Sequence, residues 1–353
     1  MAINSIRLRG VTRLFGLLAA LALGGLVSVA HAGYAAIVVN ATNGQTITEV
    51  NADQQNHPAS LAKMMTLYIT FQQLQSGQLK LDQSLPVSAW AASKSPTKLG
   101  LRAGQSISVL DCILGMVTKS ANDAATVTAE QLGGSEDHFA DMMNAQAVRL
   151  GMTHTHFTNA TGLPDEDDVT TARDMVTLAM ALYRDFPQYT QYFATKEFVF
   201  RGRLVRGHNS LMNHYPGMDG LKTGYTRASG YNLASTAERD GQRLFSVVMG
   251  GRTAAVRDRL MARLLDDGFS NQQTPAVLVA QAGVNESPGT ARRLLAALSP
   301  ISTADAETLP PAAPHCRHCR KRHPAAAHKT CTARKKGTAA CPAIAKRRSN
   351  KDE

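Results

Sequence analysis

Residues 58–67 form the segment around which the rest of the chain is organised. They read Pro58-Ala59-Ser60-Leu61-Ala62-Lys63-Met64-Met65-Thr66-Leu67. A proline and a small residue precede an apolar run without glycine until Gly77, which predicts a helix with Ser60 in its first turn. There, a hydroxyl lies among free backbone N–H groups that stabilise an oxyanion. Lys63 follows on the same face, so the segment offers a nucleophile and a candidate base.

The Ser-x-x-Lys spacing is weak evidence alone, because both residues are common. A helix N-cap followed by a solvated lysine is the alternative interpretation. Two further patterns favour catalysis. Ser120-x-Asn122 falls at a predicted junction between two helices, although it also suits an ordinary helix cap, and Lys222-Thr223-Gly224 falls on a predicted strand. All three in this order are far less expected by chance than any one of them.

The two ends of the chain differ in composition from the part between them. Residues 1–32 start with three arginines, continue with a short apolar run broken by glycines and end in Ala30-His31-Ala32. This predicts a secretory signal peptide cut before Gly33, with an uncleaved anchor as the alternative. Residues 311–353 hold 12 Lys or Arg and 2 acidic residues, so most of the net charge of +11 lies at the ends.

Residues 33–270 are long enough to bury a full core and are predicted to form one catalytic domain. Residues 271–353 are predicted to be a low-complexity basic tail, mostly disordered, because they have little apolar surface to bury. Cys112 is the one cysteine in the domain, which is therefore built without an internal disulfide. A zinc site, disulfides and unpaired thiols all stay open for the tail cysteines, Cys316, Cys319, Cys331 and Cys341.

Strand and helix patterns alternate along the domain. Residues 34–39 and 45–50 flank Asn43-Gly44, which favours an antiparallel hairpin. A second strand pair surrounds Asp240-Gly241, with Lys222-Thr223-Gly224 on an adjacent antiparallel strand. Apolar residues at helical spacing predict further helices over residues 109–117, 124–132, 138–150, 171–183 and 252–267.

Together, these motifs resemble the penicillin-binding and serine β-lactamase superfamily, and most closely its low-molecular-mass D-alanyl-D-alanine carboxypeptidases of serine peptidase family S11. The resemblance covers residues 34–268 and leaves the tail out. It implies an α/β (α+β) fold of the DD-peptidase type, with an antiparallel sheet of about five strands flanked by helices and an inserted all-helical lobe. Further blocks that carry it are Lys119-Ser120-Ala121-Asn122-Asp123-Ala124, Thr158-Asn159-Ala160-Thr161-Gly162-Leu163-Pro164 and Met249-Gly250-Gly251-Arg252.

The resemblance implies a role for each residue of the first two motifs. Ser60 would attack the carbonyl of the penultimate D-alanine of a peptidoglycan stem peptide and form an acyl-enzyme. Lys63 would act as base, with a pKa depressed by burial beside Lys222. Ser120 would relay a proton to the leaving amine, and Asn122 would orient the substrate amide.

The third motif would bind the substrate. Lys222 and Thr223 would hold the terminal carboxylate, while the N–H groups of Ser60 and Tyr225 would form the oxyanion hole, with Gly224 allowing close approach. β-Lactams would acylate the same serine, and no metal or organic cofactor is expected.

Three positions depart from the pattern of this family. Ala121 stands where a glycine is frequent. Tyr225 and His208 stand nearest to the places where better-known members have a histidine and an arginine, respectively. Tyr225 and His208 both bear on recognition of the substrate carboxylate, so His208 is counted with the substrate-binding residues.

Other functions stay open beside the carboxypeptidase. A D,D-endopeptidase that cuts peptidoglycan cross-links would use the same residues. A β-lactamase is disfavoured because no Glu-x-x-x-Asn block lies between the second and third motifs, and a non-catalytic wall-binding protein because Ser60 and Lys63 are both present. For an exported protein, the basic tail favours anionic wall or membrane polymers over nucleic acid as partners.

Overall fold

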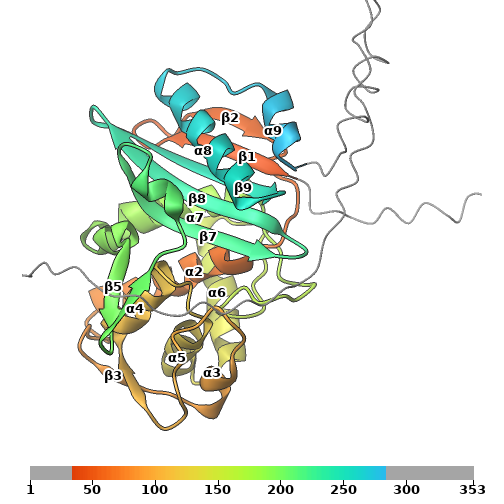
Figure 1. Cartoon of the computed structure of the whole chain (residues 1–353). Helices are drawn as coiled ribbons and strands as arrows, with labels where there is room; N and C mark the ends of the chain where they lie inside the picture. Colours follow the sequence, from red (N-terminus) through yellow and green to blue (C-terminus); the bar gives the residue numbers. More distant parts are fainter. Residues whose placement is uncertain (1–33, 284–353) are drawn as a thin grey trace, which may run out of the picture. The chain divides into compact units, whose positions relative to one another are not determined.

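A five-stranded antiparallel sheet dominates the structure, a computed structural model that describes residues 34–283 (Figure 1). Its strand order is β2-β1-β9-β8-β7, so the N-terminal hairpin pairs with the last strand of the chain. This confirms the two predicted hairpins and the predicted place of the Lys222 strand. The strands are β1 (Ala35–Asn40), β2 (Thr46–Val50), β7 (Met218–Thr226), β8 (Gly230–Arg239) and β9 (Gln242–Gly251).

Helices cover both faces of the sheet, which explains why residues 35–39 of β1 are all apolar. Ala35, Ile37 and Val39 face a core shared with α2 (Lys63–Gln75) and α7 (Ala172–Asp185). Ala36 and Val38 face the opposite core, shared with α8 (Ala254–Phe269). Successive strand residues point to opposite faces, so a strand buried on both sides reads as one apolar run.

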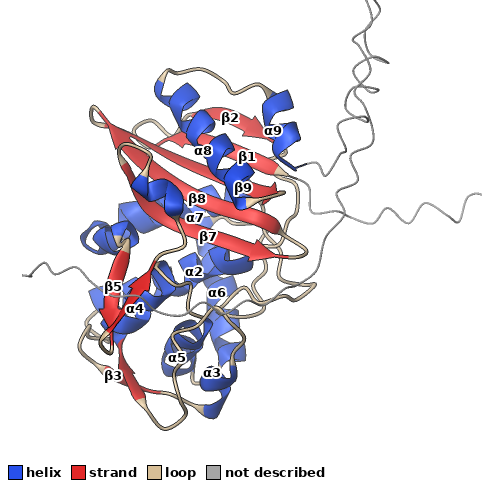
Figure 2. Cartoon of the chain, viewed as in Figure 1, coloured by secondary structure: helices blue, strands red, loops and turns tan. Residues whose placement is uncertain are grey.

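A second lobe is inserted between α2 and α7 and lies below the sheet in Figure 2. It holds α3 (Ala89–Ser93), α4 (Val109–Val117), α5 (Asn122–Gly133) and α6 (Glu136–Leu150), together with strands β3 (Ser84–Pro86) and β4 (Ser106–Ser108). The lobe was expected to be all-helical. The two strands escape sequence analysis because each is three residues long, too short for an alternating pattern.

The polypeptide between α7 and β7 forms a small hairpin and two 3₁₀ segments. Strands β5 (Glu197–Phe200) and β6 (Arg203–Arg206) pair antiparallel. The 3₁₀ segments are η2 (Pro187–Ala194) and η3 (Ser210–Asn213). The hairpin therefore extends away from the main sheet, beside α4 (Figure 1).

Regular structure continues beyond the predicted end of the domain at residue 270. Helix α9 (Ala276–Gly283) buries Val279 and Ala282 against α8 and β9. Its eight residues are too few to give a clear helical period, so the sequence analysis assigned them to the tail. The predicted signal peptide and the four tail cysteines lie outside the described residues. Within residues 34–283, no helix is both long and apolar enough to cross a membrane.

Asp123, at the start of α5, anchors a loop that lines the space between sheet and lobe. Its carboxylate is fully buried and accepts hydrogen bonds from the backbone N–H groups of Leu99 (3.0 Å), Gly100 (2.8 Å) and Leu101 (3.0 Å). A buried carboxylate is stable only with such donors around it. One side chain therefore fixes the loop against α5.

We expect Asp123→Ala to lower the free energy of unfolding by about 3 kcal/mol, because three N–H groups lose a charged acceptor. Urea unfolding followed by circular dichroism measures the change. Asp141→Ala, on the exposed face of α6, serves as the control, since its side chain is 80% exposed. Equal urea midpoints of unfolding for the two variants would contradict this role of Asp123.

Candidate active site

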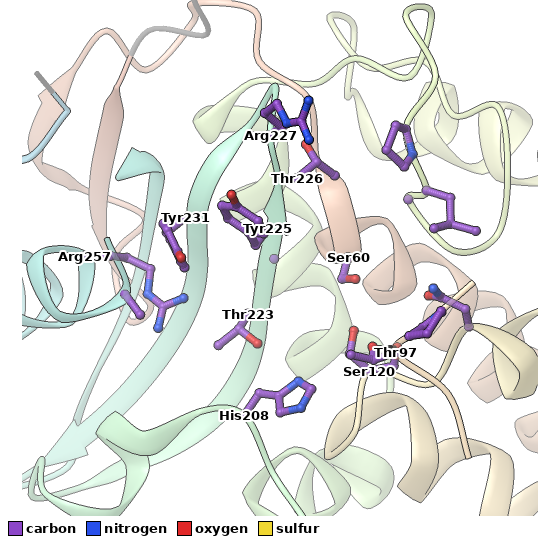
Figure 3. A pocket seen from close by; sticks show the side chains of 17 residues that line it. Ser60, Thr97, Ser120, His208, Thr223, Tyr225, Thr226, Arg227, Tyr231 and Arg257 are labelled. Carbon is purple, nitrogen blue, oxygen red and sulfur yellow. Dashed lines mark hydrogen bonds between the residues drawn. The ribbon is translucent and has the colours of Figure 1, made fainter. Parts of the chain in front are cut away.

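Ser60 lies in a single 3₁₀ turn, η1 (Ala59–Ala62), directly before α2. The sequence analysis placed it in the first turn of the α-helix itself. The tighter turn forms because Ala59 adopts a left-handed backbone with φ of 50° and the Leu61 N–H bonds to the Pro58 carbonyl at 3.2 Å. Ser60 is therefore held in rigid backbone at the N-terminal end of α2, in a pocket between sheet and lobe (Figure 3).

Lys63 connects three parts of the chain through one buried amine. Its Nζ lies 3.2 Å from Ser60 Oγ, 2.7 Å from Asn122 Oδ1 and 2.5 Å from the Thr161 carbonyl oxygen. The structure thus brings Ser60, Lys63 and Asn122 together, as the motifs predicted. The contact to Thr161 was missed, because a backbone carbonyl leaves no signal in side-chain patterns.

The environment of Lys63 favours a neutral amine. Complete burial, and then the positive charge of Lys222, lower its pKa well below the ordinary value. A neutral amine has two N–H donors and one lone pair. Asn122 and Thr161 accept from the two donors, which leaves the lone pair for the hydroxyl proton of Ser60. The geometry therefore leaves the lone pair of a neutral Lys63 amine facing the Ser60 hydroxyl.

Ser120 has an unusual backbone and an unpaired hydroxyl. Its φ is 58°, a left-handed value that is uncommon for serine, and its buried Oγ has no hydrogen-bond partner in the described structure. Strained residues of this kind occur mainly where function requires them. Ser120 lines the same pocket as Ser60 (Figure 3), so its hydroxyl is available to a bound molecule.

Strand β7 forms the opposite wall, and Gly224 sets how closely it approaches. A β-carbon at Gly224 would lie 3.1 Å from the Pro58 carbonyl oxygen and 3.3 Å from the Ser60 nitrogen. Only a residue without a side chain fits at this distance without displacing backbone. Gly224 therefore lets β7 approach the backbone of Ser60 closely, as the expected oxyanion hole requires.

Asn232, on β8, holds the segment before Ser60 in place. Its Nδ2 donates to the carbonyl oxygens of His57 (3.0 Å) and Pro58 (3.2 Å), and its Oδ1 accepts from the Gly250 N–H at 3.0 Å. Sequence analysis overlooked this residue. An asparagine within a predicted strand was the available signal, because asparagine is depleted in strands.

The pocket has a volume of about 470 Å³ and no acidic residue among those that line it. Thr223 and His208 face it from the sheet side (Figure 3). Arg257 also lines it, although sequence analysis did not single it out; it is 4% exposed and donates to the Asn232 carbonyl at 3.2 Å. An arginine on the buried face of an amphipathic helix could have drawn attention to it.

Burial and neighbouring positive charges lower the pKa values of the basic groups in the site. Burial and Arg257 lower the pKa of Lys222 to about 7. Desolvation at the pocket wall, followed by Lys222, Lys119 and Lys63, lowers the pKa of His208 to about 4, so this imidazole is neutral at pH 7. An anionic group is what such a pocket accommodates best.

Lys222→Met is expected to stabilise the protein by on the order of 1 kcal/mol, because the thioether fills the same volume without an amine to desolvate. Folding lowers the pKa of Lys222 from 10.5 to about 7. Between these values the unfolded chain binds more protons, so native stability rises with pH. The gain from Lys222→Met should be largest at pH 7 and below and shrink toward pH 10.5.

Urea unfolding at both ends of this pH range measures the gain. Lys80→Met, at an exposed position, is the matched control and should change stability little at either pH. A Lys222→Met variant that is less stable than the native protein at every pH would refute the argument.

Comparisons with known proteins agree with this geometry. The family model described as D-alanyl-D-alanine carboxypeptidase, Peptidase_S11, matches residues 27–253. The D-alanyl-D-alanine carboxypeptidase DacA of Escherichia coli K12 is 36% identical over 240 residues, which cover 66% of this chain and 60% of that protein. The chain therefore spans well under two thirds of DacA.

Two solved structures are similar. Penicillin-binding protein 5 of Haemophilus influenzae superposes with a TM-score of 0.65 at 31% identity, covering 70% of this chain and 73% of that one. The ampicillin-bound penicillin-binding protein D2 of Listeria monocytogenes gives 0.59 at 33% identity, with coverages of 67% and 96%. Motifs, geometry and these similarities lead to one conclusion: the chain belongs to the D-alanyl-D-alanine carboxypeptidase family, Peptidase_S11.

Proposed function

We propose that this protein is a serine-type D-Ala-D-Ala carboxypeptidase that removes the terminal D-alanine from peptidoglycan stem peptides. The observation that carries the proposal is the buried Lys63 amine, 3.2 Å from Ser60 Oγ, in a pocket without acidic lining. An activated serine and an anion-accepting cleft are what hydrolysis beside a free carboxylate requires. Family membership supports this assignment.

Acylation starts when Lys63 takes the proton of Ser60 and the Oγ attacks the carbonyl of the penultimate D-alanine. The backbone amides of Ser60 and Tyr225 stabilise the developing oxyanion. Ser120 delivers a proton to the leaving nitrogen, and the C–N bond breaks. Water then hydrolyses the ester, which regenerates Ser60.

Recognition of the substrate carboxylate falls to the cationic side of the pocket. Thr223 offers a hydroxyl there, while Arg257 and Lys222 supply positive charge; Lys222 Nζ itself donates to the Thr223 carbonyl at 2.7 Å. His208, neutral at pH 7, contributes hydrogen bonding instead of charge. Asn122, whose Oδ1 is held by Lys63, orients the substrate amide.

β-Lactams would acylate Ser60 by the same route, since the similar protein D2 of Listeria monocytogenes was solved in an ampicillin-bound form. The proposal includes export, because residues 1–32 have the pattern of a signal peptide. Stem peptides lie outside the cytoplasm, where an exported enzyme meets them.

We expect Ser60→Ala to abolish release of D-alanine from a pentapeptide ending in D-Ala-D-Ala, because it removes the nucleophile. Lys63→Ala should lower the rate by roughly 10²–10⁴-fold, the usual contribution of a general base. Released D-alanine is measured with a coupled oxidase assay. Acidification should slow the native enzyme as Lys63 becomes protonated.

Ser76→Ala and Lys80→Ala, both exposed, are the matched controls and should retain full activity. Release by the native protein that persists in Ser60→Ala would exclude the serine mechanism. No release by the native protein would exclude the carboxypeptidase assignment.

The basic tail, residues 311–353, is proposed to tether the enzyme to anionic wall or membrane polymers. Deleting it should reduce co-sedimentation with cell-envelope material at low salt, and added salt should release the full chain, because exposed charges are screened. A tail of equal length with Lys and Arg replaced by Gln is the control for length and should behave like the deletion. Unchanged sedimentation of both variants would count against the tether.

A further inference from the structure

A second pocket adjoins the active-site pocket and is cationic. Four basic side chains line it, over a floor made by Leu99, Phe200, Leu204 and Val205, and its volume is about 190 Å³. We call it the cationic pocket. Its basic residues are Lys98 and Lys119 from the lobe and Arg203 and Arg206 from the β5–β6 hairpin.

Most of the charge in the cationic pocket is not neutralised by protein. Within residues 34–283, no carboxylate lies within ion-pair distance of Lys98, Lys119 or Arg203. Arg206 alone has such a partner, Glu197, at 3.6 Å on the same hairpin. The pocket therefore offers several cations to an anionic ligand, above an apolar floor that accepts methylene groups.

Three chain segments connect the cationic pocket to the active site. Thr97, Ser120 and His208 line the active-site pocket, whereas their near neighbours Lys98, Lys119 and Arg206 line the cationic one. The His208 N–H bonds to the Thr118 carbonyl at 3.2 Å, which ties the hairpin to the lobe between the two pockets. The two pockets thus share a wall.

The shared wall lies on the side of the active-site pocket where the leaving group of the substrate is expected. In the mechanism above, Ser120 gives its proton to the leaving nitrogen, so the leaving residue lies beside Ser120 and His208. Figure 3 shows these residues away from Tyr225, Thr226 and Arg227, which line the other end. The methyl group of D-alanine is too short to reach beyond the active-site pocket. A longer side chain on the leaving residue would extend past the shared wall into the cationic pocket.

We propose that the cationic pocket binds a carboxylate carried on an extended side chain of the leaving residue. This rests on the proposed function and widens its substrate class from terminal D-alanine to D-alanyl bonds in cross-linked peptides, whose leaving residue continues into a second acidic stem. The chemistry is unchanged. Ser60 displaces the amine, which takes one proton, and water supplies OH to the acyl carbon and H to Ser60.

Two matched peptides test the proposal. Both end in D-Ala-D-Lys, and the lysine ε-amine carries either a succinyl group with a free carboxylate or the isosteric succinamoyl group, which is neutral. We expect kcat/KM for the succinyl peptide to exceed that for the succinamoyl peptide by about tenfold, and added salt to reduce the ratio.

Arg203→Glu, at an exposed hairpin position, should bring this ratio to one or below and leave D-alanine release from a D-Ala-D-Ala peptide unchanged. Arg201→Glu makes the same charge change on the same hairpin but outside the cationic pocket, since Arg201 bonds to Gln105 and Ser106. It should keep the native ratio.

A native ratio of one, or equal loss in both variants, would overturn the proposal while D-alanine release still upheld the carboxypeptidase. If the native protein cleaves neither class of peptide, the proposed function fails. In that case, calorimetric binding of the two D-Lys peptides to the Ser60→Ala variant tests the cationic pocket separately. Tighter binding of the succinyl peptide, lost in the double variant Ser60→Ala/Arg203→Glu, supports the pocket. Equal binding of the two peptides refutes it.

Discussion

Burial of one lysine amine is the constraint on which the site depends. Lys63 Nζ reaches Ser60 in the turn before α2, Asn122 at the start of α5 and the Thr161 carbonyl in the loop after α6. The start of α2, the start of α5 and the loop after α6 are thus all positioned around a single nitrogen atom. The same burial depresses the pKa of the amine, so the interaction that fixes the geometry also favours the neutral form of Lys63.

The surrounding structure sustains positive charge that folding alone would avoid. Lys222 and Arg257 are both nearly fully buried, and within residues 34–283 only Arg257 has an ion pair, to Asp258 at 2.7 Å. Burial of a charged group costs stability, and its retention is typical of functional sites. Rigid polar anchors offset part of this cost elsewhere. Asp123 holds the loop of residues 99–101, and Asn232 holds the segment before Ser60, each through several hydrogen bonds.

Along the cleft, the chemical character changes from one end to the other. Tyr225 and Tyr231, together with Arg227, line the end near the turn between β7 and β8. Toward Ser120 the wall leads to a cluster of lysines and arginines on the lobe and the β5–β6 hairpin. The end near Ser120 therefore carries more positive charge, which favours an anionic group there.

The cluster of Ser60, Lys63 and Asn122 and most regular elements could be predicted from the sequence alone. Ser60-x-x-Lys63 is a local spacing, and caps such as Ser108 and Thr171 bond to backbone three residues away, so both are written in neighbouring residues. Only the tertiary structure decided the 3₁₀ turn at Ser60, helix α9, the role of Arg257, the Thr161 contact and the cationic pocket. The turn follows from the left-handed backbone of Ala59. The other features depend on groups far apart in the chain, which packing brings together and which leave no periodic pattern in the sequence.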